Sequence, residues 1–169
     1  MTKEIQLTQG QTALVDDDDF DTLNQFKWIA QRSRSTFYAN QCLKVNGKWT
    51  AISMHRAILS PLPDEETDHI NGNGLDNRRS NLRLANRAQN SFNRKLNKNN
   101  KSGFKGVRRS PSGRWRAEVR FKGKTLHLGH FNTVERAAQA YDSIAIELFG
   151  EFARLNFQED HVNSIRGIK

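Results

Sequence analysis

The sequence of 169 residues contains a single cysteine, Cys42, and only three prolines. A lone cysteine excludes an intramolecular disulfide and any zinc site built from several cysteines. No apolar run approaches the length that crosses a bilayer, and the N-terminus has no signal-peptide core. These absences predict a cytosolic protein with no membrane partner.

Acidic residues are scarce in one part of the chain. Between Arg94 and His130 twelve lysines and arginines stand against one carboxylate, Glu118, whereas the first 22 residues carry six carboxylates and one lysine. The formal net charge is +9 and the isoelectric point about 10.1. The positive charge is therefore localised, which predicts a polyanionic partner, most commonly a nucleic acid.

Residues 4–53 show the alternation of apolar and polar residues that is typical of short strands. Trp28 and Trp49 are predicted to pack under a small sheet. The run from Asp16 to Asp19 is predicted to be a solvated turn that caps a short helix from Phe20 to Phe26, because four adjacent carboxylates do not have the spacing of a calcium loop.

The most informative stretch lies between Thr67 and Lys95. Thr67 to Ile70 and Leu82 to Ala85 read as strands, separated by a loop rich in Asn, Gly and Asp, and residues 86–95 read as a helix. This arrangement is too small to bury a core alone. It can hold together four polar side chains: Asp68, His69, Asn81 and Asn90.

These four residue types suit hydrolysis of a phosphodiester bond. Asp68 and Asn90 offer the hard oxygen ligands that Mg²⁺ or Mn²⁺ prefers. A neutral imidazole on His69 can take a proton from water near pH 7. Asn81 either holds the imidazole by its other nitrogen or ties the loop to the strand. The alternative is a polar loop whose Asn side chains cap their own backbone, but that does not account for the whole set.

The stretch resembles the HNH motif of the ββα-metal endonucleases, including homing endonucleases of phages and introns. The matching residues are Asp68-His69, Asn71-Gly72, Asp76-Asn77, Asn81-Leu82 and Asn90. The resemblance implies that Asp68 and Asn90 bind one divalent metal, that His69 is the general base and that Asn81 orients it. Asn90 replaces the second histidine of the motif, a variant that resembles enzymes nicking one strand.

Two residues upstream are secondary site candidates. Residues 54–59 read as a short helix that Pro61 and Pro63 bring to an end. His55 in this helix is either a ligand or a packing residue, and Arg56 can reach a phosphate. A Met-His-Arg run at this distance before Asp-His resembles the same endonuclease family.

The second half of the chain predicts another module. Residues 114–121 alternate strictly, with Trp115 and Phe121 on the apolar face and three arginines with one glutamate on the other. Neighbouring strands are predicted at 104–109 and 124–128. A helix is predicted from Thr133, its N-cap, to Gly150, its C-cap, with an apolar side that covers the sheet. The arginine face is left open for DNA.

Residues 103–157 resemble the Apetala-type (AP2) domain of plant ethylene-response factors, in which a three-stranded sheet lies in the major groove. The resemblance rests on Gly106-Val107-Arg108, the run from Trp115 to Arg120, Leu128-Gly129-His130-Phe131 and Leu155-Asn156-Phe157. Residues expected to contact DNA, from the family positions and from the same face of the sheet, are Lys105, Arg108, Arg109, Arg114, Arg116, Glu118, Arg120 and His127. Ser110, Ser112, Thr125 and His127 replace Arg or Trp, so the plant target sequence is not expected.

Together these features predict an α+β protein with a β-rich region and nuclease module (1–95), a linker (96–102), a DNA-binding domain (103–157) and a tail (158–169). The predicted function is a site-preferring DNA endonuclease of the homing type that uses Mg²⁺ or Mn²⁺ and leaves 5′-phosphate and 3′-hydroxyl ends. Its partner is double-stranded DNA, with no small-molecule substrate, in a bacterial host or phage-infected cell. The alternatives are a DNA-binding regulator with a silent nuclease site and an RNA-binding protein. The oligomeric state stays open.

Overall fold

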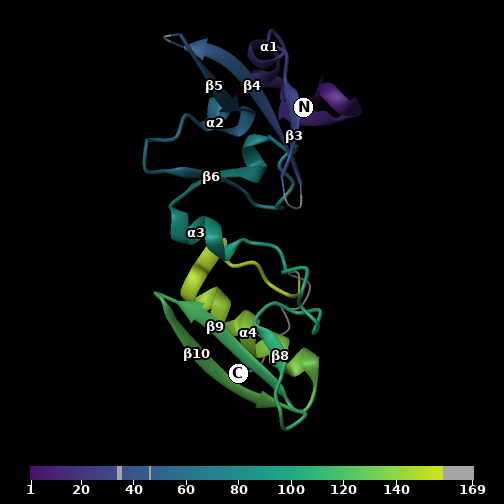
Figure 1. Ribbon diagram of the computed structural model, residues 1–169, viewed down its shortest axis with the longest axis vertical. Coiled ribbons are helices and arrows are strands. Elements are labelled where there is room, and N and C mark those ends of the chain that lie inside the picture. Colours follow the sequence, from purple (N-terminus) through teal and green to yellow (C-terminus); the bar gives the residue numbers. More distant parts are fainter. Residues whose placement is uncertain (34–35, 46, 158–169) are drawn as a thin grey trace. The chain divides into compact units, whose positions relative to one another are not determined.

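The computed structural model describes residues 1–33, 36–45 and 47–157, apart from the side chain of residue 45 (Figure 1). The predicted tail at 158–169 lies outside these residues. The fold is α+β, as the sequence predicted, and the contacts divide the chain into two compact units, 1–93 and 94–169. No helix in the described part is long and apolar enough to cross a membrane.

The first unit begins with a hairpin and a short helix. Strand β1 (Thr2–Gln6) pairs antiparallel with β2 (Thr12–Asp16), with a 3₁₀ turn at Thr8–Gly10 between them. Helix α1 (Asp17–Leu23) follows at once. It starts three residues earlier than predicted, because three of the aspartates form its first turn, where carboxylates favour the helix dipole.

A second sheet has the order β3 (Ile29–Arg32), β4 (Phe37–Val45) and β5 (Lys48–Ser53), all antiparallel, and leads into helix α2 (Met54–Leu59). Trp28 is fully buried and donates its ring N–H to the carbonyl of Leu23, which confirms its predicted packing role. The prediction for Trp49 was wrong, because its side chain is 74% exposed near the end of the β4–β5 hairpin.

The predicted strand–loop–strand–helix arrangement is present. Strand β6 (Glu66–His69) pairs antiparallel with β7 (Leu82–Ala85), after a 3₁₀ turn at Arg79–Asn81, and helix α3 (Arg87–Phe92) follows. Asn86 and Gln89 form a capping box at the start of α3. The helix is shorter than predicted and ends before Asn93.

The second unit is a three-stranded antiparallel sheet covered on one face by a helix (Figure 1). Its elements are β8 (Val107–Arg109), β9 (Trp115–Phe121), β10 (Lys124–Phe131), α4 (Val134–Phe149) and a 3₁₀ turn at Gly150–Phe152. Ala117 and Val119 of β9 are buried, and Ala117 packs in one core cluster with Ala137 and Ala138 of α4, which confirms the predicted apolar face. Thr133 caps the helix through its hydroxyl, as predicted.

Candidate functional site

Asn81 fastens the loop between β6 and β7. Its side-chain oxygen accepts from the backbone N–H of Asn71 at 3.0 Å, and its amide donates to the carbonyl of Asp76 at 2.7 Å. The amide of Asn71 donates to the Asp76 carboxylate at 2.8 Å. The structure therefore has Asn81 tying the loop to the strand, which is the second of the two arrangements that the sequence allowed.

His69 is held by a different asparagine. Its Nε2 atom lies 3.3 Å from Oδ1 of Asn77, a side chain with no exposed surface. An amide oxygen only accepts, so Nε2 carries the proton and Nδ1 keeps its lone pair. Burial lowers the pKa of His69, which keeps the imidazole neutral near pH 7. Sequence reasoning assigned no role to Asn77, although Asp76-Asn77 stood within the recognised motif.

Asp68 lies at the end of β6 beside His69 and is 6% exposed. Arg83 of β7 pairs with its Oδ2 at 2.7 Å, and Asn93 donates to both carboxylate oxygens at 3.0 Å. Asn90 makes a different contact, because its amide donates to Glu66 at 2.6 Å. Sequence reasoning gave no role to Asn93 or Glu66.

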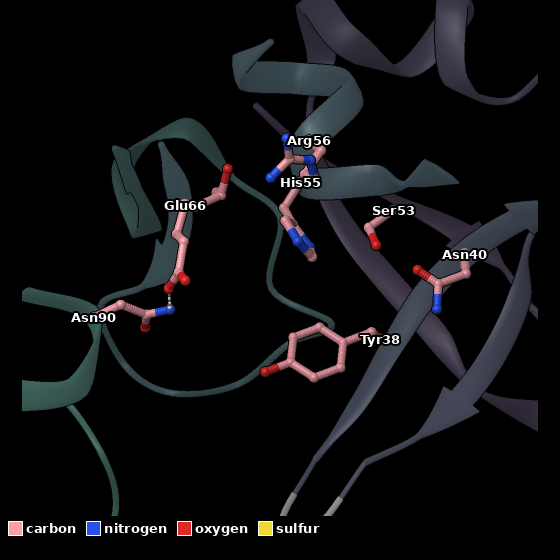
Figure 2. A pocket seen from close by; sticks show the side chains of 8 residues that line it. Tyr38, Asn40, Ser53, His55, Arg56, Glu66 and Asn90 are labelled. Atoms are coloured by element: carbon pink, nitrogen blue, oxygen red, sulfur yellow. Dashed lines mark hydrogen bonds between the residues drawn. The ribbon is translucent and has the colours of Figure 1, made fainter. Parts of the chain in front are cut away.

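A pocket of about 330 Å³ lies beside these residues (Figure 2). Figure 2 shows Tyr38, His55 and Glu66 reaching towards it from β4, α2 and β6. The residues that line it are Tyr38, Asn40, Ser53, His55, Arg56, Glu66, Thr67 and Asn90. Asp68 and His69 are not lining residues. The His69 ring nevertheless packs on two residues that are, with ring centroids 5.0 Å from His55 and 5.7 Å from Tyr38.

Buried polar atoms without a partner gather at this place. Among the described residues they are Asn40 Oδ1, His55 Nδ1, Thr67 Oγ1 and Asn77 Nδ2. The first three belong to lining residues, and the fourth belongs to the residue that holds His69. Unpaired buried polar groups cost about 1–3 kcal/mol each, so their concentration marks a place that water or a ligand completes.

The oxygen atoms near the pocket suit a hard cation. The amide nitrogen of Asn90 donates a hydrogen bond to Glu66, which leaves the side-chain oxygen of Asn90 available as a ligand for a cation. Asp68 offers a carboxylate shared with Arg83 and Asn93. Mg²⁺ binds proteins through one or two carboxylates and completes its shell with water and phosphate. The described residues contain no cluster of three His, Cys, Asp or Glu side chains, so such an ion would draw other ligands from water or substrate.

The second unit carries the predicted charged face. Glu118 lies at its centre, 3.1 Å from Arg108, 3.3 Å from Arg116 and 3.6 Å from His127. The strand pairing explains this cluster, since Arg108 opposes Arg116, and His127 opposes Glu118. Arg116 also contacts the His127 ring, at 2.7 Å from Nε2.

Four other predicted DNA contacts have different surroundings. Arg114 donates to the carbonyl of His130 at 2.7 Å, and the guanidinium of Arg109 stacks on Trp115. Arg120 is exposed on β9. The ammonium of Lys105 donates to the carbonyl of Arg94, and burial lowers the pKa of Lys105 to about 8. Lys105 is thus bound within its own unit rather than displayed on the sheet.

Two family models match the chain, one for each unit. The model for an HNH endonuclease matches residues 60–92, and the model for an AP2 domain matches residues 102–151. The β6–loop–β7–α3 arrangement lies in the first match, and the three-stranded sheet with the whole of α4 lies in the second.

Relatives of both kinds are found. An uncharacterised HNH endonuclease of Acanthamoeba polyphaga mimivirus is 35% identical over 154 residues, which cover 88% of this chain and 76% of that protein. The ethylene-responsive transcription factors ERF069 of Arabidopsis thaliana and ERN1 of Medicago truncatula are 47% and 39% identical. These two matches cover 38% and 49% of this chain, and 44% and 32% of the plant proteins.

Proposed function

The chain belongs to the HNH endonuclease family and carries an AP2 domain after its nuclease segment, and on this basis we propose that it is a metal-dependent, site-preferring DNA endonuclease of the homing type. The observation that carries the proposal is the buried contact between His69 and Asn77 beside a pocket lined with unpartnered polar atoms. Double-stranded DNA is the partner that suits both domains.

The reaction is hydrolysis of a phosphodiester bond, with His69 as general base. Neutral His69 takes a proton from a water molecule at Nδ1, while Nε2–H stays on Asn77. The water oxygen bonds to phosphorus, the bond from phosphorus to the 3′ oxygen breaks, and that oxygen gains a proton from solvent. The ends are a 5′-phosphate and a 3′-hydroxyl. Asp68 and Asn90 would hold Mg²⁺ or Mn²⁺, which stabilises negative charge on the phosphate when it is bound.

Other residues of the chain position the substrate. Arg56 is exposed at the pocket and supplies a positive charge for a phosphate oxygen. Arg108, Arg116 and Arg120 share one face of the sheet in the second unit, and this shared face supports the proposal that they enter the major groove, where arginine reads guanine. The nuclease unit would then supply the chemistry, and the sheet most of the sequence preference.

The test uses the purified chain with supercoiled plasmid in Mg²⁺, in Mn²⁺ and in EDTA, beside His69→Ala and Asp68→Ala variants. We expect nicked or linear products with either ion and none in EDTA. Both variants should bind the plasmid without cutting it. Binding without cleavage by the unmodified chain in both ions would instead indicate a DNA-binding regulator with a silent nuclease site.

A further inference from the structure

One face of the β4–β5 hairpin begins in the pocket and continues beyond it. Side chains alternate along a strand, and directly opposed residues of an antiparallel pair share a face. Tyr38 and Asn40 of β4 line the pocket, as does Ser53 of β5, which opposes Asn40. The same face continues through the opposed pairs Cys42–Ala51 and Lys44–Trp49. We call this face the hairpin track, and it comprises Asn40, Cys42, Lys44, Trp49, Ala51 and Ser53.

The outer part of the hairpin track is uncovered by its own unit. Cys42, Lys44 and Ala51 are exposed, and Trp49 leaves 74% of its side chain in solvent. Burying a tryptophan removes about 150–250 Å² of largely apolar surface from water, so leaving one exposed gives up a large favourable term. The small side chains of Cys42 and Ala51 separate this tryptophan from the pocket and leave space above the strands.

We propose that the hairpin track binds the DNA duplex that flanks the scissile bond, an inference that rests on the proposed endonuclease function. The track is continuous with the pocket, so DNA leaving the pocket in this direction lies along it. Lys44 supplies the charge for a backbone phosphate, and Trp49 packs on the sugars beside it. Asn40, whose Oδ1 is a buried acceptor with no partner in the described chain, lies where the hairpin track meets the pocket.

The dimensions fit this partner. From Tyr38 to Lys44 β4 advances six residues, or about 20 Å at the usual rise per residue. That distance matches about six base pairs of B-DNA. A two-stranded ribbon has the width that the major groove admits, and the right-handed twist of paired strands lets it follow the groove.

The single cysteine of the chain gives a direct test, because Cys42 lies in the middle of the hairpin track. The rate of its alkylation by a maleimide is measured on the full chain, free and saturated with plasmid DNA at low salt in EDTA. We expect the bound chain to react at least tenfold more slowly. The matched control is the Cys42→Ser, Thr50→Cys double variant, because Thr50 is exposed on the opposite face of the hairpin. DNA should change the alkylation rate of this double variant less than twofold.

Two lysines supply a second, independent readout. Lys44 lies on the hairpin track, whereas Lys48 is exposed on the other face. Lys44→Ala should reduce the slope of log affinity against log salt by about one phosphate contact, and Lys48→Ala should leave it unchanged. Trp49→Ala should weaken binding severalfold without a change of slope.

The outcomes separate this inference from the proposed function. If the chain cuts plasmid while DNA leaves the alkylation rate of Cys42 unchanged, the endonuclease function stands and the proposal that the hairpin track binds DNA is wrong. Equal protection of Cys42 and of a cysteine at position 50 also overturns the track, because the shielding would then not depend on the face. Protection of Cys42 in a chain that binds but never cuts retains the DNA contact and removes the nuclease proposal. Absence of any DNA binding rejects both.

Discussion

The Nε2 atom of His69 lies 3.3 Å from Oδ1 of Asn77, and both side chains are buried. This contact sets the tautomer of the imidazole, and the rings of His55 and Tyr38 pack on it, with centroids at 5.0 and 5.7 Å. Asn77 is itself held by strand β2, because its backbone N–H donates to the carbonyl of Leu14. The N-terminal hairpin therefore supports the position of the histidine from outside the motif.

Replacing His69 should greatly slow DNA cleavage and leave DNA binding nearly unchanged. We expect His69→Ala to lower the cleavage rate about 10²–10⁴-fold, the usual contribution of a general base. The dissociation constant for DNA should change less than twofold, since the buried imidazole is not a lining residue of the pocket. Cleavage of plasmid and gel-shift binding are measured on the same preparation. A variant that cuts at the rate of the unmodified chain would remove His69 from the mechanism.

The pH dependence should follow the surroundings of His69. Burial lowers the pKa of its imidazole, so the neutral base is present at pH 7 and above, and the rate should fall only in acid. In Asn77→Asp the new carboxylate would favour the imidazolium and raise that pKa. The acid side of the profile of kcat/KM should then move to higher pH. An unchanged profile in this variant would show that Asn77 does not act on the base.

Local sequence patterns were enough to predict the elements that carry the site. The turn-rich loop between the two strand-like stretches at 67–70 and 82–85 predicted β6 and β7, and strict alternation at residues 114–121 predicted β9 and its two faces. These signals suffice because the apolar–polar alternation of a strand can be recognised in consecutive residues, whereas the strands that pair with it cannot.

The sequence could not show which of two residues of the same type occupies a given position in the site or the core, and only the folded structure distinguishes them. Asn77 and Asn81 lie in the same loop, and no sequence pattern says which one faces the imidazole. Trp28 and Trp49 both stand in β-like stretches, but one is covered by α1 and β2 neighbours in the core while the other lies far along a hairpin. Tyr38 comes from a strand distant in sequence, so nothing local linked it to the site.

The stability of the first unit should depend on His55. Burial lowers the pKa of His55 to about 3, against 6.5 for the free side chain. The unfolded chain therefore binds this proton first as the pH falls, so the stabilising contribution is complete above pH 6.5 and is lost towards pH 3. The full loss is at most about 5 kcal/mol. His55→Phe keeps a ring but cannot titrate, so the free energy of unfolding of this variant should fall less between pH 7 and 5. Parallel pH curves for the two proteins would contradict this account.

One substitution should make the second unit unfold at a lower temperature than the first. A Cβ at Gly106 would lie 2.0 Å from the Tyr141 ring, at a φ of +73°, so Gly106→Ala should destabilise the second unit by roughly 2–5 kcal/mol. Gly123→Ala is the matched control, because Gly123 also has positive φ but nothing within 4 Å. Thermal unfolding should show an early transition only in the first variant. That variant should still nick plasmid weakly, with little site preference, since the first unit has its own core.

Arg120 offers the cleanest test of base reading by the sheet. Unlike Arg108 and Arg116, which pair with Glu118, it forms no ion pair with another described residue, so its removal leaves no buried partner behind. We expect Arg120→Ala to cost about 1–3 kcal/mol on the preferred site and much less on a scrambled duplex.

The matched comparison for Arg120 is Lys98→Ala, because the exposed Lys98 precedes the sheet in the predicted linker. A lysine on phosphate should weaken both duplexes alike and reduce the salt slope by about one contact. Titrations at two salt concentrations distinguish the two patterns. If Arg120→Ala lowered affinity equally for both duplexes, Arg120 would be a phosphate contact, and the preference would have to arise elsewhere on the chain.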